Sequence, residues 1–405
     1  MATTNQIMAI NRLQKSFTPN RPIDVPELLS GRLDLLFNVT EAINTQGLHV
    51  ILYGDRGTGK TSIAHVIARN IQEPERKDGR RAILVSCDSI DDYSSMWRKV
   101  FQEIMLNQRQ LGFVQQNAAD ILGFDIGTLD INAPMKTPND IRLLIKSFPN
   151  HTIVIFDEFD RINSNSNARL LMADTIKLFS DSNVKATIVL VGVASSISEL
   201  IYEHQSVARN VKQIPVEPMS ITELAEIIQK GYSKSGFSFE DNIDFRIAAL
   251  SQGYPHYTHL LGLWAGRKAV EENRDRISQF DIEQAIPAAL QNAAGGIMQD
   301  YENAIISSQP DNLFKDVLLA CAIAERDALG RFGIKALREP LRKILNKPNI
   351  RPVAYQGHLA KFCDQRRGAI LKRTGGRHNY RWYFTNPQLI PYIMLEGIKR
   401  GKIAK

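Results

Sequence analysis

The stretch HVILYGDRGTGKTSIAHVIA, residues 49–68, constrains the fold of this chain more than any other. Its apolar start predicts a buried strand, and its end repeats apolar residues at the spacing of a helix. Between them, GDRGTGKT has the Walker A spacing: Gly54, four residues, then Gly59, Lys60 and Thr61. A loop of this kind between a strand and a helix predicts a parallel α/β sheet with a phosphate-binding loop at its edge.

The residue types in this loop indicate ATP with Mg²⁺ as the ligand. Glycines allow backbone N–H groups to surround phosphates, and the following helix points its positive N-terminal end at them. We expect Lys60 to reach the β- and γ-phosphates and the Thr61 hydroxyl to take a place on Mg²⁺. The expected nucleotide contacts in the loop are Gly54, Asp55, Arg56, Gly57, Thr58, Gly59, Lys60, Thr61 and Ser62.

A second acidic motif, HTIVIFDEFDRI, follows about a hundred residues later. Four apolar residues predict a buried strand that ends at Asp157 and Glu158. Asp157 at a strand end beside the phosphate loop could hold Mg²⁺ through water, and Glu158 could polarise an attacking water. An acidic turn after a core strand is the alternative for this segment alone. Its pairing with the Walker A loop favours the second half of an ATPase site.

The charge of the chain is unevenly distributed. The formal net charge is +7, yet residues 312–405 carry 20 Lys and Arg against 6 Asp and Glu, a net +14. The remaining 311 residues therefore carry a net −7. A basic C-terminal quarter on an acidic body suggests contact with a polyanion. Charge alone leaves a solvated surface without a partner equally open.

Composition also indicates where the protein works. An apolar run of about 18 residues is missing, so we expect no membrane span, and the start of the chain does not resemble a secretory signal. Cys87, Cys321 and Cys363 lie too far apart for a metal-ligand spacing, so we expect buried free thiols in a reducing cytosol. The predicted location is the cytoplasm, and the nucleoid if the chain binds DNA.

Together these motifs resemble the AAA+ ATPases over roughly 290 residues. ELLSGRLDLL, residues 27–36, is similar to the box before the phosphate loop in initiator- and loader-like members, and also to the entry of STAND NTPases. The resemblance implies a doubly wound parallel P-loop sheet, an α-helical lid and a C-terminal winged helix. The expected strands after the first are RAILVSC (81–87), TIVIFD (152–157), ATIVLVG (186–192) and VKQIPV (211–216).

The resemblance also implies two further residues of the ATPase cycle. Ser195 stands where these proteins place a first sensor, usually Asn; a helix N-cap is the alternative role. Arg209 precedes the last strand, where a finger would reach a neighbour's γ-phosphate, so it implies a homo-oligomer; a surface arginine is the alternative.

The expected lid departs from the initiator pattern. Ser220 and Glu223 form a capping box at the start of its first helix. Where many AAA+ proteins have a second-sensor arginine, this chain has GYPHYTH. Gly253 and Pro255 resemble the Gly-x-Pro element of STAND NTPases, which implies an adenine contact for Pro255.

The basic C-terminal segment resembles a winged helix. Three helix-like stretches precede AILKRTGGRHNYRWYF, which predicts a hairpin with its turn at Gly375 to His378. Such modules bind double-stranded DNA, but they also dock proteins. The expected phosphate contacts are Lys361, Arg366, Arg367, Lys372, Arg373 and Arg377.

Three domains are therefore expected: 1–217 for the nucleotide, 218–308 for the lid and 309–405 for the winged helix. We expect an ATP-hydrolysing, oligomeric switch that binds DNA. The alternatives are a STAND-like regulatory or defence NTPase whose winged helix docks protein, and a transposition-type regulator that forms an ATP-dependent filament on DNA. Residues 105–140 carry no recognisable motif.

Overall fold

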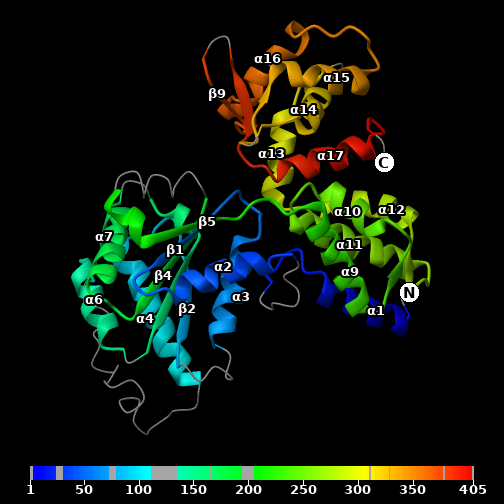
Figure 1. Cartoon of the computed structure of the whole chain (residues 1–405). Helices are drawn as coiled ribbons and strands as arrows, with labels where there is room; N and C mark the ends of the chain where they lie inside the picture. Colours follow the sequence, from blue (N-terminus) through cyan, green and yellow to red (C-terminus); the bar gives the residue numbers. More distant parts are fainter. Residues whose placement is uncertain are drawn as a thin grey trace. The chain divides into compact units, whose positions relative to one another are not determined.

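The computed structural model shows two compact units (Figure 1). It describes residues 3–23, 31–72, 79–110, 135–148, 150–163, 166–193, 205–309, 312–327, 329–376 and 379–403, without the side chains of 107–110, 205 and 206. One unit comprises residues 22–217. The other combines residues 1–21 with residues 218–405. Each unit is described by itself below.

The first unit contains a five-stranded parallel sheet. Its strands are β1 (His49–Tyr53), β2 (Arg81–Ser86), β3 (Thr152–Asp157), β4 (Ala186–Gly192) and β5 (Val211–Pro215). Their spatial order is β2-β3-β4-β1-β5, and every neighbouring pair is parallel. All five strands lie where the sequence predicts them, which confirms the α/β fold class.

Helices cover both faces of this sheet because alternate strand residues point to opposite sides. Val50, Ile153 and Val189 contribute to the core under α2 (Leu33–Asn44) and α3 (Lys60–Gln72). Ile51, Val154 and Ile188 contribute to the opposite core. There they pack under α4 (Tyr93–Gln110), α6 (Pro138–Lys146) and α7 (Ala168–Asp181). Parallel strands place their carboxyl ends at one edge, so β1 delivers the phosphate loop beside the end of β3.

The helix after the phosphate loop forms as predicted. Its apolar stripe, Ile63, Ile67, Ala68 and Ile71, is buried in the core that it shares with β1. The amphipathic spacing thus holds α3 on the sheet and fixes its N-terminus at the loop.

The second unit begins with the lid helices. They are α9 (Ile221–Ser235), α10 (Ile243–Ser251), α11 (Pro255–Glu271) and α12 (Gln279–Gln291), with the two short strands β6 (Ser238–Phe239) and β7 (Arg276–Ile277). Ser220 and Glu223 make the predicted capping box at α9. Helix α1 (Thr4–Ser16) packs against α9 and α11 and brings Phe17 with it. A Cβ atom on Gly262 would lie 2.7 Å from the Phe17 ring, so this close approach requires glycine.

Residues 1–21 thus belong with the lid, whereas the sequence predicts them in the nucleotide domain. The expected division after residue 217 coincides with the division between the two units.

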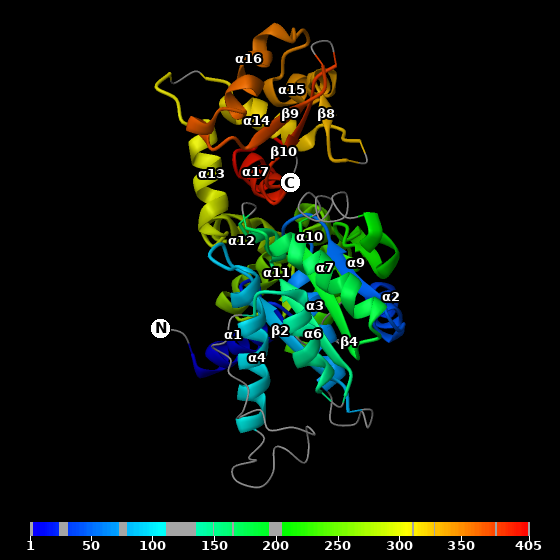
Figure 2. The ribbon, with the colours of Figure 1, turned by 90° about the vertical axis from the view of Figure 1, so that its left-hand side faces the viewer.

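The C-terminal residues form a helical group with a small antiparallel sheet (Figure 2). The helices are α13 (Gly295–Ile305), α14 (Phe314–Ile323), the 3₁₀ helix η5 (Ile334–Leu337), α15 (Arg338–Leu345), α16 (Val353–Phe362) and α17 (Leu389–Lys399). The sheet has the order β8 (Phe332–Gly333), β10 (Arg381–Phe384), β9 (Leu371–Thr374). Strands β9 and β10 flank the predicted turn, and Trp382 and Phe384 of β10 are buried.

Lid and C-terminal helices share one core. The Tyr257 hydroxyl of α11 donates to the Gln388 carbonyl at 3.0 Å, directly before α17. The Tyr301 and Tyr392 rings meet edge to face with centroids 5.2 Å apart. Residues on both sides of the expected boundary at 308 therefore pack together.

Two expectations from the composition concern buried free cysteines and a membrane span. Cys87 and Cys321 are buried free thiols, and burial raises the pKa of both. Cys363 is also a free thiol, but it is only half-buried, contrary to the expectation. Within the described ranges, none of the helices has the length and apolar character needed to cross a membrane.

Candidate functional site

Backbone geometry explains the glycines of the phosphate loop. A Cβ atom on Gly54 would lie 2.2 Å from the carbonyl oxygen of Val216, so any side chain there would collide with the backbone after β5. Gly57 and Gly59 have φ of 81° and 92°, a region that residues with a side chain rarely adopt. The loop can therefore curve tightly enough to turn its N–H groups toward a common centre.

Lys60 lies along the inside of this loop. Its ammonium donates to the carbonyl oxygens of Gly54 at 3.0 Å and Asp55 at 2.7 Å. Burial lowers the lysine pKa, whereas the nearby carboxylates, Asp160 first among them, raise it. Thr58 closes the loop by donating from its hydroxyl to the Asp55 carbonyl at 3.0 Å.

The structure brings Thr61 and Asp157 together, although nearly a hundred residues separate them. Asp157 ends β3 and is buried. Its carboxylate accepts from the Thr61 hydroxyl and, at 2.9 Å, from the backbone N–H of Glu158. Burial raises the pKa of Asp157, and these two hydrogen bonds lower it again.

This pair fits Mg²⁺ as the sequence predicts. Mg²⁺ bound with ATP takes few protein ligands, because phosphates and waters complete its octahedron. A threonine hydroxyl hydrogen-bonded to one buried carboxylate beside a phosphate loop supplies such a set. The described residues contain no cluster of three or more His, Cys, Asp or Glu that could hold a metal ion.

Glu158 has an unusual backbone and an occupied side chain. Its φ of 54° and ψ of 34° place it in the left-handed region, which costs energy for a residue with a side chain. One carboxylate oxygen accepts from the Arg161 guanidinium at 2.7 Å, and both side chains are about half exposed. The pair thus holds Glu158 in one orientation at the edge of the site.

Asp160 is a site residue that the motif pattern did not single out. Its carboxylate accepts from the Val193 N–H at 3.2 Å, just beyond β4, and its charge acts on Lys60. Gly192 permits this contact, because a Cβ atom there would lie 3.0 Å from the Asp160 carboxylate. Its position as the third acidic residue of DEFD could have marked Asp160 as a candidate. Only the order of the strands shows that Asp160 faces the end of β4.

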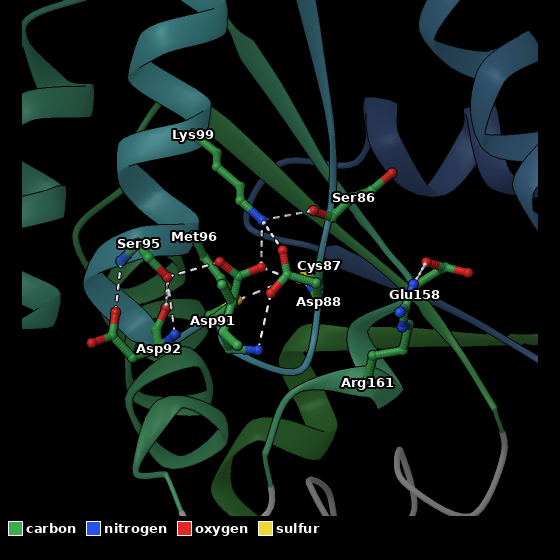
Figure 3. A network of polar contacts seen from close by, with 11 residues as sticks. Ser86, Cys87, Asp88, Asp91, Asp92, Ser95, Met96, Lys99, Glu158 and Arg161 are labelled. Atoms are coloured by element: carbon green, nitrogen blue, oxygen red, sulfur yellow. Dashed lines mark hydrogen bonds and ion pairs between the residues drawn. The ribbon is translucent and has the colours of Figure 1, made fainter.

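A network of polar contacts supports the adjacent strand end (Figure 3). The Lys99 ammonium donates to Asp91 at 2.6 Å, to Asp88 at 3.0 Å and to the Ser86 carbonyl at 3.2 Å. The Cys87 N–H donates to the Asp157 carbonyl at 2.8 Å. Helix α4 thereby anchors the end of β2 and, through it, the end of β3. We infer a supporting role for Lys99 in positioning Asp157.

Arg209 lies near the amino ends of the strands, whereas the phosphate loop follows the carboxyl end of β1. It belongs to the 3₁₀ helix η4 (Gln205–Asn210), which leads into the N-terminal end of β5. His49, the first residue of β1, pairs with Val211, whereas the phosphate loop follows the last residue of β1. A five-residue strand therefore separates Arg209 from its own loop by about 13 Å. The guanidinium is 73% exposed and lies 3.7 Å from the Asp181 carboxylate.

Other predicted residues are placed as follows. Ser195 and Arg377 lie outside the described residues, as does most of 105–140. Pro255 is the first residue of α11, and Gly253 has a φ of 89° as the chain turns into that helix. His256 beside it is tied to the N-terminal segment, with its Nδ1 2.8 Å from the Pro19 carbonyl oxygen.

The basic C-terminal side chains that were expected to contact DNA phosphates differ in exposure and in their partners. Arg366 is 89% exposed and pairs with Asp364 at 2.7 Å. Arg367 instead donates to the Ala304 carbonyl at 2.8 Å and lies 4.0 Å from the Phe314 ring. Lys361 lies 5.3 Å from that ring, Lys372 is exposed on β9, and Arg373 lies 4.2 Å from the Tyr380 ring. The structure thus commits Arg367 to packing between α13 and α14.

Comparison with known proteins agrees with this geometry. Residues 50–217 match the ATPase family associated with various cellular activities (AAA). The site and the sheet order thus belong to an AAA domain. No curated protein sequence matches the chain.

Solved structures extend the likeness in fold beyond this domain. A Walker-type ATPase of Pyrococcus abyssi is 16% identical with a TM-score of 0.55, covering 93% of this chain and 99% of its own. The ORC2 protein of Aeropyrum pernix, in its ADPNP–ADP complexes, is 16% identical with a TM-score of 0.54, covering 97% and 99%. The fold of the chain is therefore similar to the folds of these two proteins over nearly its whole length.

Proposed function

We propose that the protein is an ATP-driven switch that hydrolyses ATP with Mg²⁺ when it oligomerises, and that binds double-stranded DNA through its C-terminal helices and sheet. The observation that carries the proposal is the convergence of Lys60, Thr61, Asp157 and Glu158 at one edge of the sheet. The ADPNP–ADP complexes of the A. pernix protein of similar fold support a nucleotide as the ligand.

Each residue has a separate task in this proposal. Lys60 would leave its loop carbonyls for the phosphates, and Thr61 with Asp157 would hold Mg²⁺, which neutralises phosphate charge when bound. Glu158 would accept the proton of the attacking water. One oxygen of its carboxylate is bonded to Arg161, so the other oxygen would accept the proton while that pair is intact.

Arg209 would act on a neighbouring copy. It is exposed and lies a full strand length from its own phosphate loop, so intramolecular use would require refolding of β5. A guanidinium supplied in trans is worth about 10³–10⁵ in rate where it operates. Hydrolysis would then depend on assembly.

The C-terminal region would supply the DNA contact. The order of elements in this region is that of a winged helix: helices α14, α15 and α16 precede strands β9 and β10. The same region, residues 312–405, has a formal net charge of +14. Arg366, Lys372 and the other basic side chains would meet phosphates, so affinity should fall steeply with salt. This role would place the protein at the nucleoid in the cytoplasm.

A second candidate is a regulatory NTPase of the STAND kind whose C-terminal module docks protein. Two observations favour it: Pro255 starts α11 after a left-handed Gly253, and the Tyr257–Gln388 hydrogen bond fastens α11 to the segment before α17. A module held on the lid in this way could couple bound nucleotide to partner docking.

The first test is ATPase rate against protein concentration, with and without non-specific duplex DNA. A rate per chain that rises with concentration and again with DNA supports the DNA-assembled switch. A flat rate that does not respond to DNA favours the second candidate.

Glu158→Gln should abolish turnover without abolishing ATP binding, whereas Glu41→Gln on α2 should change neither. Wild-type turnover in Glu158→Gln would refute the assignment of Glu158 as the base.

The role of Arg209 can be tested by mixing two inactive variants. Lys60→Ala retains Arg209 but should no longer bind nucleotide well at its own site. Arg209→Ala retains its nucleotide site but lacks the arginine that would act on a neighbouring copy. If Arg209 acts in trans, mixing them should restore turnover at the Arg209→Ala sites. Arg142→Ala, a half-buried arginine on α6, is the control and should be active alone. No recovery in a mixture that still oligomerises would contradict the proposal.

A further inference from the structure

A groove runs between α16 and strand β10 of the C-terminal sheet. One hollow of about 870 Å³ is lined by Arg326, Lys335, Gln356, Tyr380, Arg381 and Trp382, among others. A second hollow of about 450 Å³ shares Gln356, Tyr380 and Trp382 and adds Arg373. We call these adjoining hollows the wing groove. Their size is that of sites that take small organic molecules.

Aromatic rings line the wing groove. The Tyr380 ring is half-buried, and the Arg373 guanidinium lies 4.2 Å from its centre. Trp382 is 5% exposed, and its indole N–H is buried without an acceptor among the described residues. The Arg326 Nε is likewise buried without a partner in the same part of the structure. Both nitrogens lie beneath the surface, so a ligand in the groove would meet the rings rather than these two donors.

The charge of the groove favours an anion. Arg326, Lys335, Arg373 and Arg381 line it, against Glu325 and Asp327. Asp327 is already paired with Arg331 at 3.0 Å. An aromatic platform with surplus positive charge suits a planar ring that carries a phosphate.

Helix α16 presents few side chains for contacting base edges in a duplex. Its exposed positions include Val353, Ala354, Gly357 and Ala360, and its exposed long polar side chains are Gln356 and Lys361. Recognition in the major groove relies on Arg, Lys, Asn or Gln reaching base edges. Gln356 also lines the wing groove, where its amide can both donate and accept.

We propose that the wing groove binds an unpaired base of a single-stranded nucleic acid. The base stacks on Tyr380, Gln356 bonds to its edge, and Lys335 and Arg381 contact the flanking phosphates. Bases in a duplex remain stacked on one another and cannot enter such a hollow, whereas every unpaired base has a free π-face. The inference rests on the proposed nucleic-acid binding and adds a preference for unpaired strands.

The test compares two fluorescein-labelled probes by anisotropy with the full-length protein, ATP and Mg²⁺: a 20-nucleotide oligo-dT strand and a 20-base-pair duplex. Tyr380→Ala should weaken single-strand binding about 5- to 100-fold. It should leave duplex binding within about twofold, because backbone contacts remain. Tyr380→Phe keeps the ring and should bind as the unaltered protein does. Tyr383→Ala, on the same strand but outside the groove lining, is the matched control and should also be unchanged.

The possible outcomes distinguish failure of the wing-groove proposal from failure of the proposed DNA binding. If neither probe binds, the proposed DNA binding fails, and the groove proposal fails with it. If the duplex binds but Tyr380→Ala and Tyr383→Ala affect the single strand equally, only the groove proposal is overturned. Polyglutamate provides charge without rings and should bind the unaltered and Tyr380→Ala proteins alike. Tighter binding of polyglutamate than of oligo-dT, lost in Tyr380→Ala, would assign the groove to an acidic peptide instead.

Discussion

The attachment of the N-terminal segment to the lid should weaken in acid because of His259. This residue is 6% exposed on α11, and its Nδ1 accepts from the Thr18 N–H at 3.3 Å. Burial first, and the charge of His256 second, lower its pKa from 6.5 to about 4. A protonated ring could not accept from Thr18, and its charge would be buried.

The sign and size follow from linkage. The folded state prefers the neutral ring, so its contribution is complete above the unfolded pKa of 6.5. That contribution falls as the pH drops from 6.5 toward about 4, where it is lost. At pH 5 the unfolded ring is mostly protonated and the folded ring mostly neutral. The free energy of unfolding should therefore be about 2 kcal/mol lower at pH 5 than at pH 7.5 through this residue alone.

His259→Asn isolates this effect, since the Asn Oδ1 can accept from Thr18 without titrating. Urea unfolding of both proteins at pH 7.5 and pH 5 gives two free-energy losses, and their difference belongs to His259. His49 lies in the nucleotide unit, where burial lowers its pKa to about 3. It titrates identically in both proteins and cancels. If His259→Asn lost as much stability on acidification as the unaltered protein, the reasoning would be refuted.

Three further outcomes are expected from the packing. Phe17→Ala empties a fully buried position and should lower the free energy of unfolding by about 3–5 kcal/mol, measured by urea unfolding, whereas Phe17→Leu should cost clearly less; equal losses would contradict the close fit of the ring. Gly54→Ala places a methyl group against the Val216 carbonyl and should weaken fluorescent ATP binding at least about tenfold; unchanged affinity would show that the loop can shift. Arg274→Met leaves the buried Asp281 carboxylate with only Ser278 as a donor and should cost about 3 kcal/mol, again by urea unfolding, with a loss below about 1 kcal/mol counting against the pair.

Local patterns predicted a large part of this structure. The five strands followed from short β-branched runs, and the phosphate loop followed from glycine spacing, because each signal lies within about ten residues. The capping box of Ser220 and Glu223 was predictable for the same reason. These features depend on neighbours along the chain, and their geometry is nearly independent of the rest of the fold.

What the sequence did not predict depends on contacts between distant segments. Asp160 faces the end of β4 only because β3 and β4 are adjacent in the sheet. The Glu158–Arg161 pair is the exception, because its residues are only three apart and it depends on the left-handed turn after β3. Arg367 was expected on phosphate, but α13 offers it the Ala304 carbonyl and α14 the Phe314 ring. None of these partners is visible in a linear pattern.

The pairing of Phe17 with the lid also sets an order of events during synthesis. Thr18 and His259 are 241 residues apart, so the ribosome releases the N-terminal helix long before its binding surface exists. At about 5–20 residues per second, roughly 10–50 s pass in between. During that interval Leu13 and Phe17 have no partner from the lid, while the whole nucleotide unit emerges and can fold. Helix α1 therefore reaches its final packing only after the nucleotide unit and the first lid helices have been made, so changes to this helix would interfere with the completion of folding rather than with its start.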